Sequence, residues 1–106
     1  MPKYLMESTY TPEGIRALHK DKASARKEAV IKLLQSVEGK LEAFYYAMGD
    51  RDVIAIVELP DATTAAAVSL TGSATGLYKV TTTPLLSIEE VDRALARKLT
   101  IRAPGQ

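Results

Sequence analysis

The sequence predicts an α+β domain in which four antiparallel strands form one sheet in the split-βαβ arrangement, with an additional helix at the C-terminal side. Two observations lead to this fold class. Strand-like and helix-like segments follow one another in the required order along 106 residues, a length typical of one domain. The segment 53–57 is apolar at five consecutive positions, which is typical of a strand that is covered on both faces.

Residues 3–10 predict the first strand, and residues 12–38 predict a helical region after it. Thr11 suits the N-cap of the first helix, and the proline that follows suits the first helical position. The middle of the helical region is polar, so we expect a break there with a new N-cap at Ser24. Gly39 stands where a helix commonly ends in a left-handed residue.

Residues 40–48 and 52–59 predict the second and third strands, joined by a tight hairpin connection at 49–52. Asp61 is a suitable N-cap for the next helix, which we expect over 62–73. This helix is rich in alanine and threonine, and such small side chains allow a helix to lie close to a sheet.

The fourth strand is expected over 77–83, with Pro84 ending it, and a last helix over 88–98. Ser87 and Glu90 have the spacing of a capping box at the start of that helix. Three apolar residues of the helix are expected to face inward: Val91, Ala94 and Leu95.

This order, βαββαβ plus a helix, is the ferredoxin-like order, and it places helices on one face of the sheet only. We expect residues 1–99 to form the domain and residues 100–106 to form a loose tail. The opposite face of the sheet would expose apolar side chains, which is unusual for a monomer. Pairing of two sheets face to face would cover them, so the sequence predicts a homodimer or higher homo-oligomer with the form of a dimeric α/β barrel.

Composition argues against several classes of partner. The net charge is +1, so no general field attracts nucleic acid or an anionic membrane. The first residues lack the apolar region of a signal peptide, and no apolar run approaches the roughly 20 residues of a membrane helix. We therefore expect a cytoplasmic protein. One local basic cluster is interpreted as a solvated helical face: Arg16, Lys20, Lys22, Arg26 and Lys27.

Several segments resemble the GYD-domain family in order and spacing, over about residues 1–98. They are 1–5, 10–15, 39–45, 49–61 and 82–86. The resemblance implies a dimeric α/β barrel and no particular reaction. In this chain Arg51 stands where the tyrosine of the family's Gly-Tyr-Asp triplet is expected, between Asp50 and Asp52, so a contact made by that tyrosine would differ here.

Few residues point to chemistry. His19 is the only histidine and a weak candidate for a catalytic acid or base; with a single histidine and no cysteine we expect no metal site and no cofactor. Tyrosines in predicted strands can line a ligand cavity, although ordinary packing is the default. The candidate ligand-binding residues are Tyr4, Tyr10, Tyr45, Tyr46 and Arg51, and Tyr78 is a further tyrosine of this kind. For Arg51, turn formation is the favoured interpretation.

The sequence therefore favours a homo-oligomeric binding or regulatory module for a small, mainly apolar metabolite. One alternative is a cofactor-independent monooxygenase or isomerase that uses His19 and tyrosines. A second alternative is a purely structural assembly subunit, which a packed interior without a cavity would favour.

Overall fold

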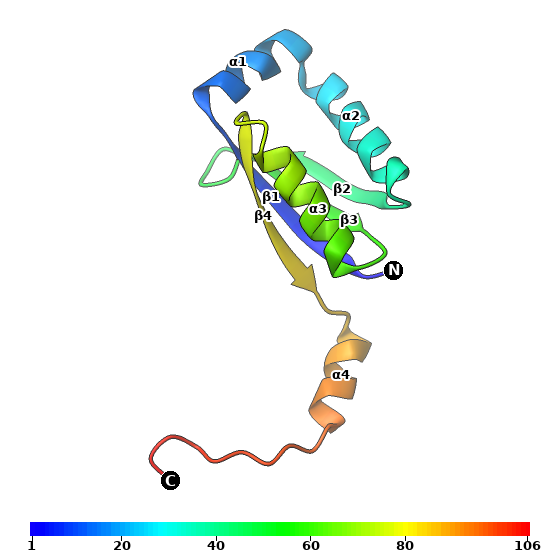
Figure 1. Cartoon of the computed structure of the whole chain (residues 1–106), viewed down its shortest axis with the longest axis vertical. Helices are drawn as coiled ribbons and strands as arrows, with labels where there is room; N and C mark the ends of the chain where they lie inside the picture. The colour runs from blue at the N-terminus through cyan, green and yellow to red at the C-terminus, as the bar shows by residue number, and fades with distance from the viewer.

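A computed structural model of the chain describes all residues from 1 to 106 and confirms the predicted α+β class and ferredoxin-like order (Figure 1). The strands are β1 Lys3–Tyr10, β2 Lys40–Tyr46, β3 Val53–Glu58 and β4 Tyr78–Leu85. The helices are α1 Pro12–Asp21, α2 Ala23–Ser36, α3 Ala62–Ser73 and α4 Ile88–Ala96. None of these helices combines the length and apolar character that crossing a bilayer requires.

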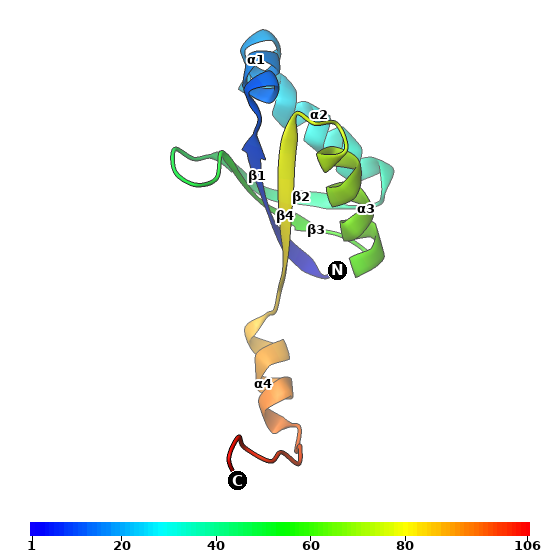
Figure 2. The ribbon, with the colours of Figure 1, turned by 60° about the vertical axis from the view of Figure 1, so that its left-hand side comes forward.

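The four strands form one antiparallel sheet in the order β2-β3-β1-β4. In the centre of the sheet, Leu5 of β1 pairs with Ile56 of β3 on one side and with Thr83 of β4 on the other. Helices α2 and α3 lie on the same side of this sheet, as both ribbon views show (Figures 1 and 2). The other face is left open by the chain.

The core lies between the sheet and these two helices. Strand β3 supplies Val53, Ala55 and Val57 to it, while Ile54 and Ile56 alternate onto the open face and are only half-buried. The apolar run predicted to need cover on both faces therefore has cover on one. Only 11 of the 106 residues are buried, so the single chain has a small core for its length.

The ends of α2 differ from the sequence prediction. The break before α2 falls at Lys22, which has a positive φ of 75° and gives α2 no side-chain cap, so Ser24 is not the N-cap. At the other end Glu38, with φ 61°, adopts the left-handed conformation expected of Gly39. Gly39 is needed for space instead, because a Cβ there would lie 2.8 Å from the backbone oxygen of Glu58 and 2.7 Å from Leu59 Cδ2.

The β2–β3 connection is a short hairpin close to the predicted one, because a hydrogen bond from Ala47 N to Asp52 O of 2.8 Å closes a loop at 48–51. One predicted boundary of the strands is wrong. Pro84 does not end β4 but lies within it, opposite Tyr4 of β1. This is permitted because β4 is an edge strand, where a missing N–H costs no hydrogen bond in the sheet.

Helix α4 stands apart from the rest of the molecule (Figures 1 and 2). Its capping box is formed as predicted, with Ser87 Oγ accepting from Glu90 N at 3.1 Å and Glu90 Oε1 accepting from Ser87 N at 3.0 Å. However, the prediction that Val91, Ala94 and Leu95 face inward is wrong, because no residue of α4 is buried. The helix ends at Ala96, two residues earlier than expected.

The detached helix lengthens the whole molecule. The radius of gyration is 17.0 Å, whereas a compact chain of this length has a value of about 13 Å. The local sequence therefore forms the helix, but nothing in the same chain receives its apolar side.

Candidate functional site

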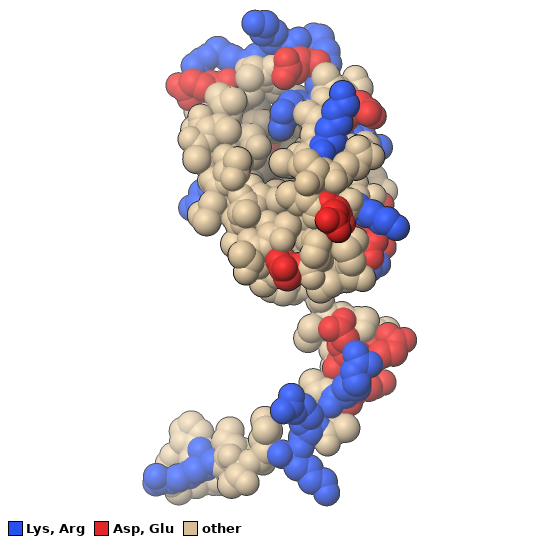
Figure 3. Space-filling model, turned by 45° about the vertical axis from the view of Figure 1, so that its right-hand side comes forward, with Lys and Arg blue, Asp and Glu red and all other residues tan.

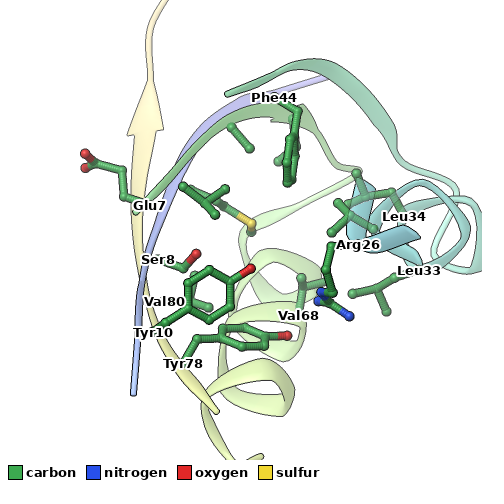
Figure 4. Close-up of a pocket in the computed structure, with 15 residues that line it drawn as sticks. Glu7, Ser8, Tyr10, Arg26, Leu33, Leu34, Phe44, Val68, Tyr78 and Val80 are labelled. Carbon is green, nitrogen blue, oxygen red and sulfur yellow. The ribbon is translucent and has the colours of Figure 1, made fainter. Parts of the chain in front are cut away.

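A pocket opens between α2, α3 and the helix-covered face of the sheet (Figure 4), with a cavity volume of about 80 Å³. Twelve of its 15 lining residues are hydrophobic, so it is an apolar pocket with few polar groups. Its apolar walls include Met6 of β1, Val30 and Leu33 of α2, Phe44 of β2 and Val68 of α3. Small-molecule sites share this apolar lining with a few polar groups, although their cavities are usually larger, about 300–1,000 Å³.

Two tyrosines form one end of the pocket. The rings of Tyr10 and Tyr78 meet edge to face, with centroids 6.1 Å apart and planes at 73°. The Tyr78 ring lies against α3 at Gly72, where a Cβ would stand 2.9 Å from Cε2 of the tyrosine. The backbone N–H of Tyr10 donates to Asp52 Oδ2 at 2.8 Å. The Tyr10 ring packs in the same way on α1, where a Cβ at Gly14 would stand 2.9 Å from its Cδ1, so both rings are fixed by neighbouring helices.

Arg26 of α2 is the only lysine or arginine that lines the pocket. Its side chain reaches into the pocket beside Tyr78 (Figure 4), with Cζ 5.8 Å from the centre of the tyrosine ring. On the surface, a basic side chain lies in the hollow between the helices (Figure 3), and this hollow is where the pocket opens. The charge of the site is therefore positive and comes from one residue.

The remaining polar groups are few. Ser8 and the hydroxyls of Tyr10 and Tyr78 face the cavity, whereas the Glu7 side chain points away from it (Figure 4). Tyr46 lies next to Tyr10, outside the pocket lining. Burial, and after it a hydrogen-bonding interaction with Tyr10, raises the pKa of Tyr46 well above that of a free tyrosine. This hydroxyl therefore stays protonated near neutral pH.

The structure places the predicted site residues in different regions. Tyr10 lines the pocket, and Tyr46 lies beside it. Tyr4 is buried in the core, and Tyr45 projects from the open face of the sheet with 70% of its surface exposed. The other two candidates lie outside the pocket: Arg51 is in the β2–β3 connection and His19 is exposed in the last turn of α1.

Sequence reasoning missed Arg26, which it assigned to a solvated basic cluster. The structure separates this residue from the cluster, because Arg26 is half-buried while Arg16, Lys20, Lys22 and Lys27 are exposed. The signal that identifies it is helical spacing. Arg26 precedes Val30 and Leu33 by four and seven positions, so all three lie on the side of α2 that faces the pocket.

No group of three or more histidine, cysteine, aspartate or glutamate side chains is placed to hold a metal ion. The pocket offers shape, apolar contact, hydroxyl groups and one positive charge. These groups can bind and orient a small molecule.

Comparison with known proteins gives one match. The family model of the GYD domain matches residues 4–95, which is most of the chain and runs from the second residue of β1 to the penultimate residue of α4. No curated protein and no solved structure matches the chain.

Proposed function

The chain belongs to the GYD-domain family, and we propose that it is a homo-oligomeric module that binds a small, mainly apolar molecule. The observation that carries the proposal is the apolar pocket between α2, α3 and the sheet, in which two fixed tyrosines and Arg26 are the main polar contributors. A cavity of this kind favours binding over the purely structural role considered from the sequence.

The open face of the sheet supports self-association. Leu5, Ile54 and Ile56 lie next to one another in the register of the central strands, and Tyr45 pairs with Ile54 from β2. No helix of this chain covers them. A second copy carries the same apolar surface, so two sheets packed face to face about a two-fold axis would cover both at once.

Helix α4 adds a second apolar surface that the single chain leaves uncovered. Ile88, Val91 and Leu95 recur at helical spacing, and Ile88 and Leu95 are 79% and 77% exposed. Since α4 directly follows β4, it extends past the end of the sheet in each copy. We propose that α4 packs on the second copy and so enlarges the same interface.

The oligomer is tested by sedimentation equilibrium at micromolar concentration. We expect a dimer or higher oligomer for the natural sequence, and a folded monomer for Ile56→Asp, which places a charge in the centre of the open face. The matched control is Ile15→Asp, at an exposed isoleucine on α1, which should leave association unchanged. A natural chain that is folded and monomeric under these conditions would contradict the proposal.

Binding is tested by titrating labelled protein with benzamide, a neutral ring-sized probe, and following amide chemical shifts. We expect the shifts to concentrate at residues lining the pocket and to disappear in Val30→Phe, which fills it. Ala29→Phe, at the exposed neighbouring position on α2, should retain them. Shifts scattered over the surface, or unaffected by Val30→Phe, would refute binding in this pocket.

We rank binding before the alternative of a cofactor-independent enzyme because of where the candidate groups lie. His19 is exposed on α1 and does not line the pocket. The polar groups that face the cavity are hydroxyls and one guanidinium, which serve to orient a ligand.

A further inference from the structure

We infer that the pocket selects a small apolar monocarboxylate, whose carboxylate pairs with Arg26 while its apolar part occupies the cavity. This inference rests on the proposed function, because it assigns a ligand class to the same pocket. It depends on two features of the structure: a guanidinium without a partner, and an interior that offers no other charge.

Arg26 has no anionic partner within the chain. The three ion pairs of the molecule join Met1 to Glu58, Lys3 to Glu42, and Arg16 to Glu13. The side chain of Arg26 takes part in none of them and donates no hydrogen bond; its guanidinium lies over the face of the Tyr78 ring. A half-buried charge has lost part of its hydration, and it is stabilised when an opposite charge joins it.

The surroundings explain why the chain does not supply that charge itself. Glu7 is the only acidic residue of the pocket lining, and its side chain points to the other side of β1 (Figure 4). The first turn of α2 contains no acidic residue. Glu28 follows Arg26 by two positions, which places it on a different side of the helix. The chain therefore supplies no counterion for Arg26, and a carboxylate on a bound ligand could supply one.

The rest of the pocket limits what this ligand can be. Arg26 is the only positive charge in the lining, so a second anionic group of a dicarboxylate or a phosphate ester would lie unpaired against apolar walls. A guanidinium matches a carboxylate with two parallel hydrogen bonds. Met6, Val30 and Phe44 offer apolar contact to the body of the ligand. A ring or a short branched chain with one carboxylate meets these conditions.

A charge series of one shape tests the inference: benzoate is negative, benzamide neutral and benzamidine positive. Dissociation constants are measured by amide chemical shifts at constant pH and salt. In the natural protein we expect benzoate to bind at least about tenfold more tightly than benzamide, since a hydrogen bond to a charged group is stronger than a neutral one. Benzamidine should bind most weakly.

Two variants complete the test. Arg26→Gln should bring the affinity for benzoate down to about that for benzamide, and it should weaken benzamide much less than benzoate, because the neutral amide loses a hydrogen bond without losing a charge pair. Arg16→Gln, at an exposed arginine on α1, should leave the whole series unchanged. Retention of benzamide binding shows that Arg26→Gln still has a formed pocket, and dispersed amide signals show that it is folded.

The outcomes separate the inference from the proposal it rests on. If benzamide binds in the pocket but benzoate binds no more tightly, the selection for a carboxylate is refuted and the apolar pocket stands. If Arg26→Gln and Arg16→Gln weaken benzoate equally, the pairing with Arg26 is refuted. If no member of the series binds to the folded protein, both the inference and the binding function are refuted.

Discussion

Helices α3 and α4 show the reverse of what their sequences suggest: the helix with the weaker apolar pattern is buried on the sheet, and the helix with the stronger pattern is exposed. Helix α3 has no regular apolar stripe, yet it packs closely on the sheet, with Ala65 and Gly72 buried. Helix α4 has a complete capping box and a clear apolar side, yet none of its residues is buried. Local sequence therefore determines that a helix forms, whereas its burial depends on which surface is within reach.

Because of this difference, α4 has an uncovered apolar side, whereas α3 has none. In α3 the small side chains allow the helix to approach the sheet of its own chain, for instance where Gly72 meets the Tyr78 ring. In α4 the apolar side chains have no surface to contact in the single chain. The apolar side of α4 is therefore available for the proposed contact with a second copy, and changes at α4 should act through that contact rather than within the chain.

The largest difference in the free energy of unfolding is expected between truncating a buried leucine of α2 and truncating an exposed leucine of α4. Leu34 of α2 is 1% exposed, so Leu34→Ala should lower the free energy of unfolding by about 2–5 kcal/mol at any protein concentration. Leu95 of α4 is 77% exposed, so Leu95→Ala should cost less than about 0.5 kcal/mol in a dissociated chain. Urea unfolding at two protein concentrations measures both.

If α4 packs on a second copy, the effect of Leu95→Ala on stability depends on protein concentration. The cost of Leu95→Ala should grow with protein concentration, because association contributes to stability only when copies meet. A cost that is large and independent of concentration would show that α4 packs on its own domain in solution.

A smaller effect is expected from removing the N-caps. Asp61 Oδ1 accepts from Thr64 N at 2.8 Å at the start of α3, and Ser87 caps α4 in the same manner. Asp61→Ala should lower the urea midpoint, because α3 unfolds with the core. Ser87→Ala should destabilise α4 by about 1 kcal/mol and leave the midpoint of the core unchanged. Amide hydrogen exchange, measured separately in α3 and α4, distinguishes these results from a loss of stability that is shared by the whole molecule.

Much of the fold follows from signals within single segments. The order of strands and helices, the N-caps at Thr11 and Asp61, and the capping box at Ser87 are all formed as predicted. These features depend on residues close together in the sequence. The alternation of buried and half-buried side chains in β3 likewise follows from the geometry of that strand alone. They could be predicted because no distant part of the chain has to be known.

The features that could not be predicted depend on contacts between distant segments. Gly39 meets Leu59, twenty positions further along the chain, so its need for space has no local signal. Pro84 is tolerated within β4 because that strand is at the edge of the sheet. Arg26 faces a cavity that exists only once α2 lies over the sheet. Of the candidate ligand-binding residues named from the sequence, only Tyr10 lines this pocket; Tyr78, which was considered with the other tyrosines, lines it too, and Arg26 was missed.

The smallest effect is a difference between α3 and α4 in the pH at which their N-terminal turns loosen. The hydrogen bond from the Ser87 backbone lowers the pKa of Glu90 below its ordinary value of 4.5, and that from the Thr64 backbone lowers the pKa of Asp61 below 3.8. A carboxylate whose pKa is lower in the folded state contributes stability above its unfolded pKa, and this stability is lost as the pH falls through the folded value.

Acidification below about pH 4.5 should therefore loosen the start of α4 before the core unfolds, while loosening of α3 should begin at lower pH. The measurement is a series of Cα chemical shifts for residues 88–91 and 62–65 between neutral and acidic pH. Glu90→Gln is the control, because glutamine can complete the same capping box without titrating. In that variant the early change in α4 should disappear. If instead α4 and the core lose structure in a single step at one pH, α4 is part of the same cooperative unit, and its separation from the sheet is not a property of the protein in solution.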